Sequence, residues 1–167
     1  MEKTKLNLIT WSNTLSCGIK LIDDQHKHLV DLVNEMFRHV TSDEKQEDFY
    51  FNKVIQEVVN YIKVHFSTEE KIMRVIKFSG YAEHKKAHDS FILTVADTIS
   101  ESKSGKKVSL YIFTKFLKEW ILSHIAVMDK QYFAYLKNIA TCKADGKLSI
   151  TLEDIQSHIN TRRESIL

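Results

Sequence analysis

The spacing of apolar residues, in a chain almost without helix-breaking residues, limits the fold more than any other feature. The 167 residues include no proline and only four glycines. Turns between strands normally use both residue types, so a fold built from many short strands is disfavoured. Apolar side chains instead recur three and four positions apart, which places them on one face of an α-helix. The sequence therefore predicts long amphipathic helices joined by short connections.

Four amphipathic segments can be traced along the chain. They are expected to run from about Leu21 to Val40, Glu47 to Ile76, Tyr81 to Ser102 and Ser109 to Ile139. The polar residues 41–44 offer an N-cap to the second segment, and Gly80 and Gly105 mark the next two connections. Ile92 and Ile112 are assigned to inward faces. Short connections make consecutive helices antiparallel, so the prediction is an all-α, up-down-up-down four-helix bundle.

The chain is divided at the end of the fourth segment. Residues 1–140 are predicted to form the bundle, and residues 141–167 a C-terminal extension whose role the sequence does not indicate. Asp145-Gly146 is a turn dipeptide, and residues from Thr151 to about Arg163 are expected to form a short extra helix.

Composition and charge exclude several classes of protein. The 24 basic and 22 acidic residues leave a formal net charge of +2, so nucleic acid is not an expected partner. No apolar run approaches the roughly 20 residues of a membrane span, and Met1 to Trp11 lacks the apolar core of a secretory signal. Two cysteines do not make a disulfide framework, so the expected location is the reducing cytoplasm.

Histidines and carboxylates with metal-ligand spacing fall on the inward faces of all four segments. They are His26, His65 with Glu69, His84 with His88, and His124 with Asp129. His65 and Glu69 are four residues apart and point the same way, as do the two histidines of the third segment. Such groups are costly to bury among apolar residues unless a cation satisfies them. The seven residues are therefore candidate ligands of a metal centre in the bundle core.

Asp129 does not fit a regular helix. It follows His124 by five residues, and an ideal α-helix would splay the two side chains by about 140°. Both can reach one centre only if the turn is locally widened, and single π-turns are frequent at functional sites. We therefore predict a π-turn between Trp120 and Tyr132. A regular helix with Asp129 facing solvent would remove this residue from the site.

The donor set narrows the choice of metal without identifying it. Seven protein ligands exceed one tetrahedral zinc site, and the set is unlike the all-oxygen sites of calcium and magnesium. Imidazole with few carboxylates suits iron, copper, nickel or zinc. Two ions that share bridging carboxylates would use seven ligands and could leave one coordination position open.

The candidate ligands belong to a wider sequence pattern. It comprises Trp11, Gly18-Ile19, Ile22-Asp23-Asp24-Gln25-His26, His65-Phe66, Glu69-Glu70, His84, Ala87-His88, Phe91, Trp120, His124-Ile125 and Asp129. Over about residues 8–138 this pattern resembles the hemerythrins, most closely the bacterial single-domain members. The resemblance implies two iron ions (Fe2+/Fe3+) with a bridging oxo or hydroxo group. It implies that His84, His88 and His124 bind one iron, that His26 and His65 bind the other, and that Glu69 and Asp129 bridge both. The iron with two histidines would keep a vacant position for dioxygen.

The resemblance implies reversible dioxygen binding, for carriage, storage or delivery, and no enzyme activity beyond a weak oxidase- or peroxidase-type reaction. Two alternatives stay open: oxygen or redox sensing through a signalling partner, and peroxide or nitric oxide turnover or iron handling at the same centre. Five neutral imidazoles leave the metal pair positively charged, which disfavours the high oxidation states of carboxylate-rich di-iron enzymes and so favours binding. The sequence leaves open whether the chain is a monomer or a homo-oligomer.

Several neighbours of the candidate ligands receive a provisional role. The wall of a dry pocket is expected to include Ile22, Ile62, Phe66, Ile121, Ile125 and Met128, each of which could equally be plain core packing. Asp23 lies one turn before His26 and is considered as a residue that orients a ligand from outside the metal shell. Glu70 is expected to be solvated, and His28 and His39 are expected on the surface because they fall off the ligand line.

Overall fold

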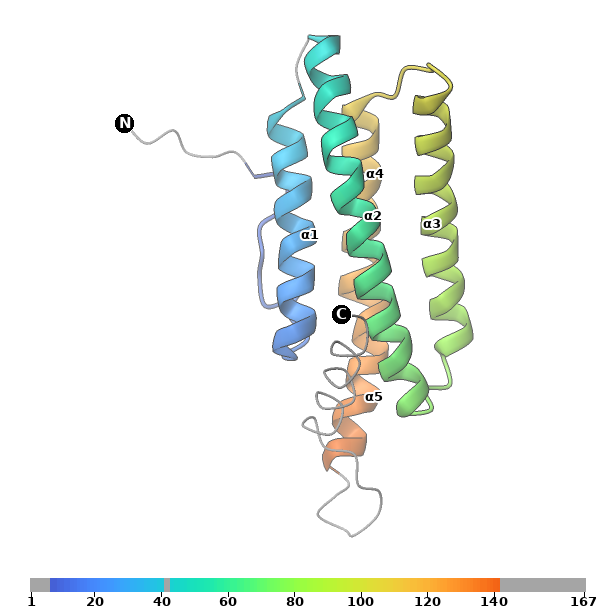
Figure 1. Cartoon of the computed structure of the whole chain (residues 1–167). Coiled ribbons are helices and arrows are strands. Elements are labelled where there is room, and N and C mark those ends of the chain that lie inside the picture. Colours follow the sequence, from blue (N-terminus) through green and yellow to red (C-terminus); the bar gives the residue numbers. More distant parts are fainter. Residues whose placement is uncertain (1–6, 41–42, 142–167) are drawn as a thin grey trace, which may run out of the picture.

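The computed structural model describes residues 7–40 and 43–141, and all regular structure within these ranges is helical. The elements are α1 (Lys20–Arg38), α2 (Glu44–Val75), α3 (Tyr81–Lys103), α4 (Leu110–Ser123), the π-helix η1 (His124–Asp129) and α5 (Lys130–Thr141). The last three follow one another without a break and form the fourth helix of an up-down-up-down bundle (Figure 1). The predicted all-α four-helix bundle is confirmed. The predicted extra helix lies outside the described residues, and the division at residue 140 stays a prediction.

Polar side chains and glycines begin and end the helices where the sequence places them. Asp43 is the N-cap of α2, and its Oδ1 accepts hydrogen bonds from the backbone N–H groups of Lys45 and Gln46, at 3.1 and 3.3 Å. The Ser109 hydroxyl accepts from the Ile112 N–H in the same way at the start of α4. Gly105, just after α3, has a φ of +82°, a conformation that glycine adopts without strain.

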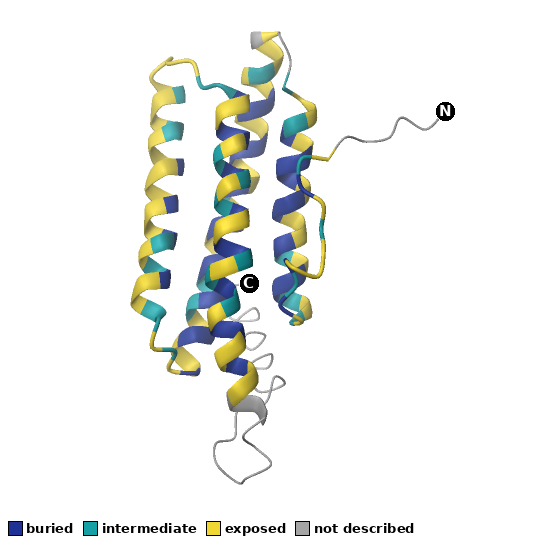
Figure 2. Ribbon diagram, turned by 180° about the vertical axis from the view of Figure 1, so that it is seen from behind, coloured by how far each residue is buried: buried dark blue, intermediate teal, exposed yellow. Residues whose placement is uncertain are grey.

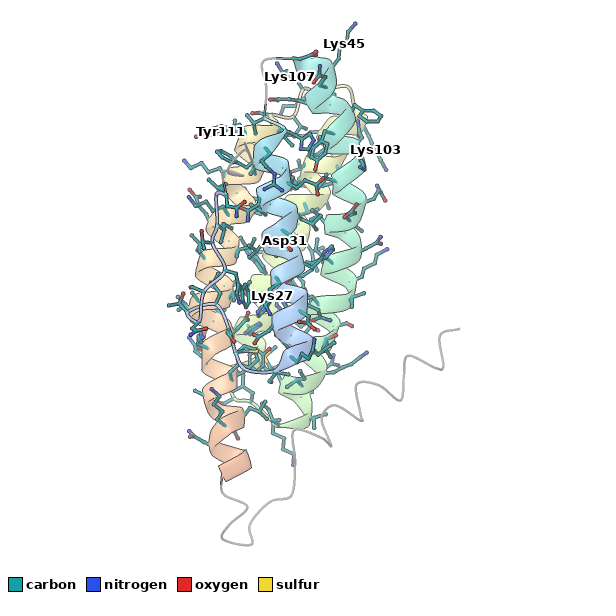
Figure 3. The ribbon with its side chains drawn as sticks, turned by 90° about the vertical axis from the view of Figure 1, so that its left-hand side faces the viewer. Lys27, Asp31, Lys45, Lys103, Lys107 and Tyr111 are labelled. Carbon is teal, nitrogen blue, oxygen red and sulfur yellow. The ribbon has the colours of Figure 1, made fainter. Side chains whose placement is uncertain are left out.

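The helices pack around a common core that they shield from solvent. Helix α1 packs against both α2 and α4, and α2 packs against α3. Large rings join α3 to α4, because Phe91 lies 5.4 Å from Phe116 and 4.2 Å from Trp120 between ring centroids. Buried residues form the inward faces (Figure 2), whereas charged side chains such as Lys27 and Asp31 project from the outer surface of α1 (Figure 3).

The core consists of two apolar clusters. The larger cluster includes Leu29 of α1 and Phe66 of α2, and the smaller includes Ile22 of α1 and Ile72 of α2. His26 lies in sequence between Ile22 and Leu29, and Glu69 lies between Phe66 and Ile72. The apolar clusters therefore bracket a polar layer and hold it away from both ends of the bundle.

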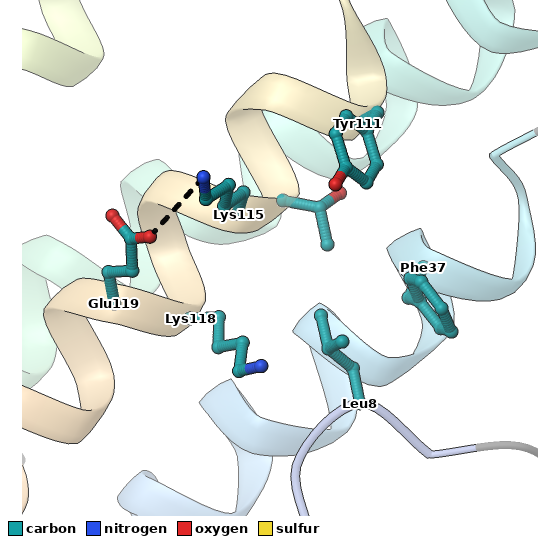
Figure 4. A pocket seen from close by; sticks show the side chains of 7 residues that line it. Leu8, Phe37, Tyr111, Lys115, Lys118 and Glu119 are labelled. Atoms are coloured by element: carbon teal, nitrogen blue, oxygen red, sulfur yellow. Dashed lines mark ion pairs between the residues drawn. The ribbon is translucent and has the colours of Figure 1, made fainter.

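The N-terminal segment is held along the bundle by polar contacts. The Ile9 N–H donates to Asn34 Oδ1 at 2.9 Å, and Asn34 Nδ2 donates back to the Ile9 carbonyl at 2.8 Å. Beside this segment, α1 and α4 form a pocket that contains none of the candidate ligands (Figure 4). Its lining is Leu8, Phe37, Tyr111, Thr114, Lys115, Lys118 and Glu119. This pocket is therefore separate from the polar layer.

Asp23 has a different role from the one considered for it. Its carboxylate accepts hydrogen bonds from the Ser16 hydroxyl at 2.6 Å, the Cys17 N–H at 2.7 Å and the Gly18 N–H at 3.2 Å. The suggestion that it orients a metal ligand is wrong, because these groups in the loop before α1 occupy its oxygens. Asp23 instead fastens the N-terminal segment to the first turn of α1.

The predicted positions of Ile92 and Ile112 on inward helix faces are also wrong. Ile112 is 67% exposed and Ile92 is 40% exposed. Helix α3 buries only a narrow stripe, formed by His84, His88, Phe91 and Val95. Its backbone lies close to α2, and it meets α4 through large side chains. An apolar residue just beside such a stripe keeps the helical spacing but meets solvent. None of the described helices is long and apolar enough to cross a lipid bilayer.

Candidate metal centre

All seven candidate ligands converge in the polar layer, and none is more than 2% exposed. Helix α1 contributes His26, α2 contributes His65 and Glu69, α3 contributes His84 and His88, and η1 contributes His124 and Asp129. Each pair on α2 and α3 is four residues apart, so both members face the bundle axis. The bundle thus brings together side chains that are up to about a hundred residues apart in sequence.

The donor atoms form two groups, and within each group all ligand atoms lie within 4.8 Å of one another. One group is Glu69, His84, His88 and His124, and the other is His26, His65, Glu69 and Asp129. Glu69 belongs to both. Asp129 also faces both, because its Oδ1 lies 3.1 Å from His124 Nε2 and its Oδ2 lies 3.3 Å from His26 Nε2. The arrangement therefore offers two neighbouring positions for a cation that share two carboxylates.

A π-turn places Asp129 in the site. Residues His124–Asp129 form a π-helix within the fourth helix of the bundle, and Asp129 is fully buried. This confirms the predicted turn between Trp120 and Tyr132. The wider turn lets residues five apart share a face, which a regular α-helix does not.

Buried donor atoms without hydrogen-bond partners mark the centre. Among the described residues they include Nε2 of His26, His65 and His84, Oε2 of Glu69, and both oxygens of Asp129. The Nε2 atoms of His88 and His124 lie only 3.0 Å apart, so a shared proton or a cation must separate their lone pairs. Leaving this many polar atoms unsatisfied in a core is costly, and a metal ion would satisfy all of them.

The protonation states leave negative charge in the centre. Burial lowers the pKa of His65 to about 3, so its imidazole is neutral. Burial raises the pKa of the Glu69 carboxyl, but the neighbouring imidazoles outweigh it and hold this pKa well below its usual value. Burial and the charge of Glu69 raise the pKa of Asp129, but His124 and His26 outweigh both and lower it. Burial lowers the pKa of His124, but Asp129 and Glu69 outweigh it and raise this pKa to about 9, so one imidazolium offsets part of the charge of two carboxylates. Both carboxylates are thus ionised, and their described ion pairs are all with histidines. A buried cation is the natural complement.

Three hydrogen bonds support the ligands from outside the cluster. His65 Nδ1 lies 2.9 Å from Gln25 Oε1, and the Tyr132 hydroxyl donates to Glu69 Oε1 at 2.6 Å. His88 Nδ1 lies 3.3 Å from Glu70 Oε1, and the Glu70 side chain is only 14% exposed. The expectation that Glu70 is solvated is therefore wrong. Such contacts fix the orientation of a metal-binding imidazole.

Comparisons with known proteins agree with this site. Residues 17–136 match the family described as the hemerythrin HHE cation binding domain. The chain belongs to the hemerythrin family. A bacteriohemerythrin of Stenotrophomonas maltophilia is 32% identical over 130 residues, covering 78% of this chain and 82% of the relative. One of Methylococcus capsulatus is 28% identical over 126 residues, covering 75% and 94%. Wild-type hemerythrin has a solved structure with a TM-score of 0.66 and 28% identity, covering 76% of this chain and 96% of that one.

Aromatic and aliphatic side chains enclose the site of this hemerythrin-family chain. The Phe66 ring stacks on His88 at 3.7 Å, and the Trp120 ring stacks on His124 at 4.2 Å, both between centroids. Ile121 and Ile125 are almost completely buried. The predicted wall is thus apolar, although Ile22 packs in the smaller cluster and Met128 is half-buried. His28 and His39 are exposed, as predicted.

Sequence reasoning missed Gln25, Tyr132 and Tyr61 as neighbours of the ligands. Gln25 directly precedes His26, but its partner is on another helix, His65 of α2. Tyr132 lies three residues after Asp129, the spacing of a helical neighbour, which is the one signal that could have indicated it. Tyr61 lies one turn before His65, and its ring stacks on that imidazole with centroids 4.8 Å apart.

Proposed function

We propose that this hemerythrin-family chain holds two iron ions in the buried cluster and binds dioxygen reversibly. The observation that carries the proposal is the pair of donor groups, which share Glu69 and face one another across Asp129. In this proposal His84, His88 and His124 would hold one iron, His26 and His65 would hold the other, and Glu69 and Asp129 would serve both, with an oxo or hydroxo group as a further shared ligand. The orphaned donor atoms and the ionised carboxylates fit such a pair.

The two groups are unequal in a way that favours ligand binding. Three imidazoles serve one position and two serve the other, although each position has access to both carboxylates. The position beside His26 and His65 therefore has one protein donor fewer. A bound, reduced iron pair would supply the electrons for binding dioxygen beside His26 and His65.

The protein's own part is to orient donors and exclude water. Gln25, Glu70 and Tyr132 fix ligand side chains through the hydrogen bonds described above. Ile121 and Ile125 lie beside the η1 ligands and are nearly inaccessible to solvent, which limits the entry of water and anions. A dry, imidazole-rich centre suits reversible binding better than turnover. We place the protein in the cytoplasm, in keeping with the buried free thiol of Cys17.

The test is an optical one. Iron-loaded, reduced protein exposed to air should gain a visible charge-transfer band, which should disappear under vacuum and return with air. Conversion to the ferric state without a reversible band would contradict oxygen carriage. Sustained loss of added peroxide or nitric oxide over many turnovers would instead support the enzymatic alternative.

A further inference from the structure

The hydroxyl of Tyr61 is buried without a hydrogen-bond partner among the described residues. The whole residue is only 5% exposed. Burying a hydroxyl without a partner is costly, and a phenylalanine would fill the same space without that cost. Tyr132 is the other buried tyrosine near the cluster. Its hydroxyl, by contrast, donates a hydrogen bond to Glu69 Oε1. The oxygen atom of Tyr61 is therefore open to a partner outside the described residues.

Tyr61 lies against the side of the centre that has two histidines. It precedes His65 by one turn of α2, and the two rings stack with a centroid distance of 4.8 Å and an angle of 26°. His65 in turn meets His26 edge to face at 4.8 Å. The Nδ1 atom of His65 already has Gln25 as its partner, so the Tyr61 hydroxyl is not needed to orient this imidazole.

A phenol hydroxyl is protonated at neutral pH and can therefore donate a hydrogen bond. None of the described residues accepts this hydrogen bond from Tyr61, so its acceptor would have to come from outside the protein.

We propose that the Tyr61 hydroxyl donates a hydrogen bond to a small exogenous ligand bound beside His26 and His65. The ligand class is a diatomic or triatomic molecule or anion with a terminal acceptor atom, such as dioxygen or azide. This inference rests on the proposed di-iron function. It makes Tyr61 a positioning residue that raises affinity for ligands able to accept a hydrogen bond at their outer end.

Azide titration of the iron-loaded, ferric full chain tests the proposal. Tyr61→Phe should raise the Kd for azide about tenfold, as expected for one hydrogen bond to a charged acceptor. The matched control is Tyr50→Phe, which removes another tyrosine hydroxyl from α2. Tyr50 is 6% exposed and stacks on His39, which is not a ligand. Its variant should bind azide as the unaltered protein does.

A second measurement does not depend on any variant. The stretching vibration of azide bound to the unaltered protein should shift on transfer to D2O, and the shift should vanish in Tyr61→Phe. An unchanged Kd in Tyr61→Phe, or no isotope shift in the unaltered protein, would overturn the proposal. So would a lower melting temperature of iron-free Tyr61→Phe with unchanged azide affinity, which would point to a structural water. Failure of the unaltered, iron-loaded protein to bind azide or dioxygen would instead refute the proposed function itself.

Discussion

Asp129 Oδ1 lies 3.1 Å from His124 Nε2, although five residues of one helix separate the two positions. The π-helix His124–Asp129 is the cause, because its wider turn brings both side chains to the inner face. The carboxylate then reaches across the centre, and its second oxygen lies 3.3 Å from His26 Nε2. One distorted turn thereby provides a link between the two donor groups.

Loss of the Asp129 charge should disturb both metal positions. Asp129→Asn keeps the size of the side chain but removes the negative charge that faces both groups. We expect the iron content of the purified protein to fall from about two per chain to one or fewer. Metal analysis against protein concentration measures it. Glu119→Gln, which removes a carboxylate exposed on α4, is the control and should retain the full content. Full iron content in Asp129→Asn would argue against a bridging role.

Removal of one histidine should affect one position more than the other. His26→Ala takes a donor from the group that has two histidines, so iron retention there should fall and the iron-to-protein ratio should approach one. His28→Ala, on the same helix but exposed, should keep a ratio of two. If His26→Ala also keeps two irons through gel filtration with a chelator, the assignment of this ligand is wrong.

Loss of the hydrogen bond between Gln25 and His65 should lower the metal affinity. Gln25→Ala removes the acceptor 2.9 Å from His65 Nδ1. Comparable contacts in metalloproteins are worth about 10- to 100-fold in affinity, and we expect a loss in that range. Competition with a chelator of known affinity gives the value. Asp24→Ala alters the exposed neighbour on α1 and should change the affinity little; equal affinities for both variants would count against an orienting role of Gln25.

Asp23 should stabilise the fold rather than the metal. Asp23→Ala leaves the N–H groups of Cys17 and Gly18 without their acceptor, which should lower the free energy of unfolding by about 2 kcal/mol. Iron content should be unchanged, and a loss of iron would restore the idea of a role at the centre. Urea unfolding of the iron-free protein measures the difference.

The effect of Asp23 should depend on pH in a defined direction. Burial alone raises its pKa, but hydrogen bonds from Ser16, Cys17 and Gly18 outweigh burial and lower the pKa below the ordinary 3.8. The folded state thus binds this proton less readily than the unfolded state. The stabilisation is complete above about pH 4 and is lost as the pH falls through the lowered pKa. The difference in free energy of unfolding between the iron-free unaltered protein and iron-free Asp23→Ala should therefore become smaller in acid. A difference that stays constant with pH would contradict this account.

Removal of iron should lower the melting temperature. A ligand present at about 1,000 times its Kd adds about 4 kcal/mol of stability, which corresponds to a shift of about 10 °C for a protein of this size. The carboxylates and the unpaired imidazole atoms of the site are buried, so the melting temperature should depend on bound iron more strongly than it would for an exposed site. Differential scanning calorimetry of iron-loaded and iron-free protein measures the shift, and identical melting curves would exclude a cation that satisfies the core.

Local residue patterns were sufficient for the helices, for the candidate ligands and even for the π-turn. The three- and four-residue spacing identifies the helices because that spacing is a property of the backbone itself. The five-residue step from His124 to Asp129 is likewise a local conflict, and a widened turn is its local solution. The cap at Asp43 and the stop at Gly105 follow from the same kind of short-range chemistry.

Relations between helices were not available from the same patterns. The spacing does not show that Gln25 meets His65, that Glu70 turns to His88, or that Asp23 serves a loop. Nor does it show that Ile112 faces solvent, since an apolar stripe can be wider than the surface a neighbouring helix covers.

The sequence by itself therefore determined the all-helical character of the protein and which residues could act as ligands, because both depend on periodicity along one helix. Only the tertiary structure decided which histidines share a carboxylate, which outer residues orient them and where the unpaired Tyr61 hydroxyl lies. Those features depend on how the helices are rotated and packed against one another. That rotation is set by the whole core at once and is not encoded in any single segment.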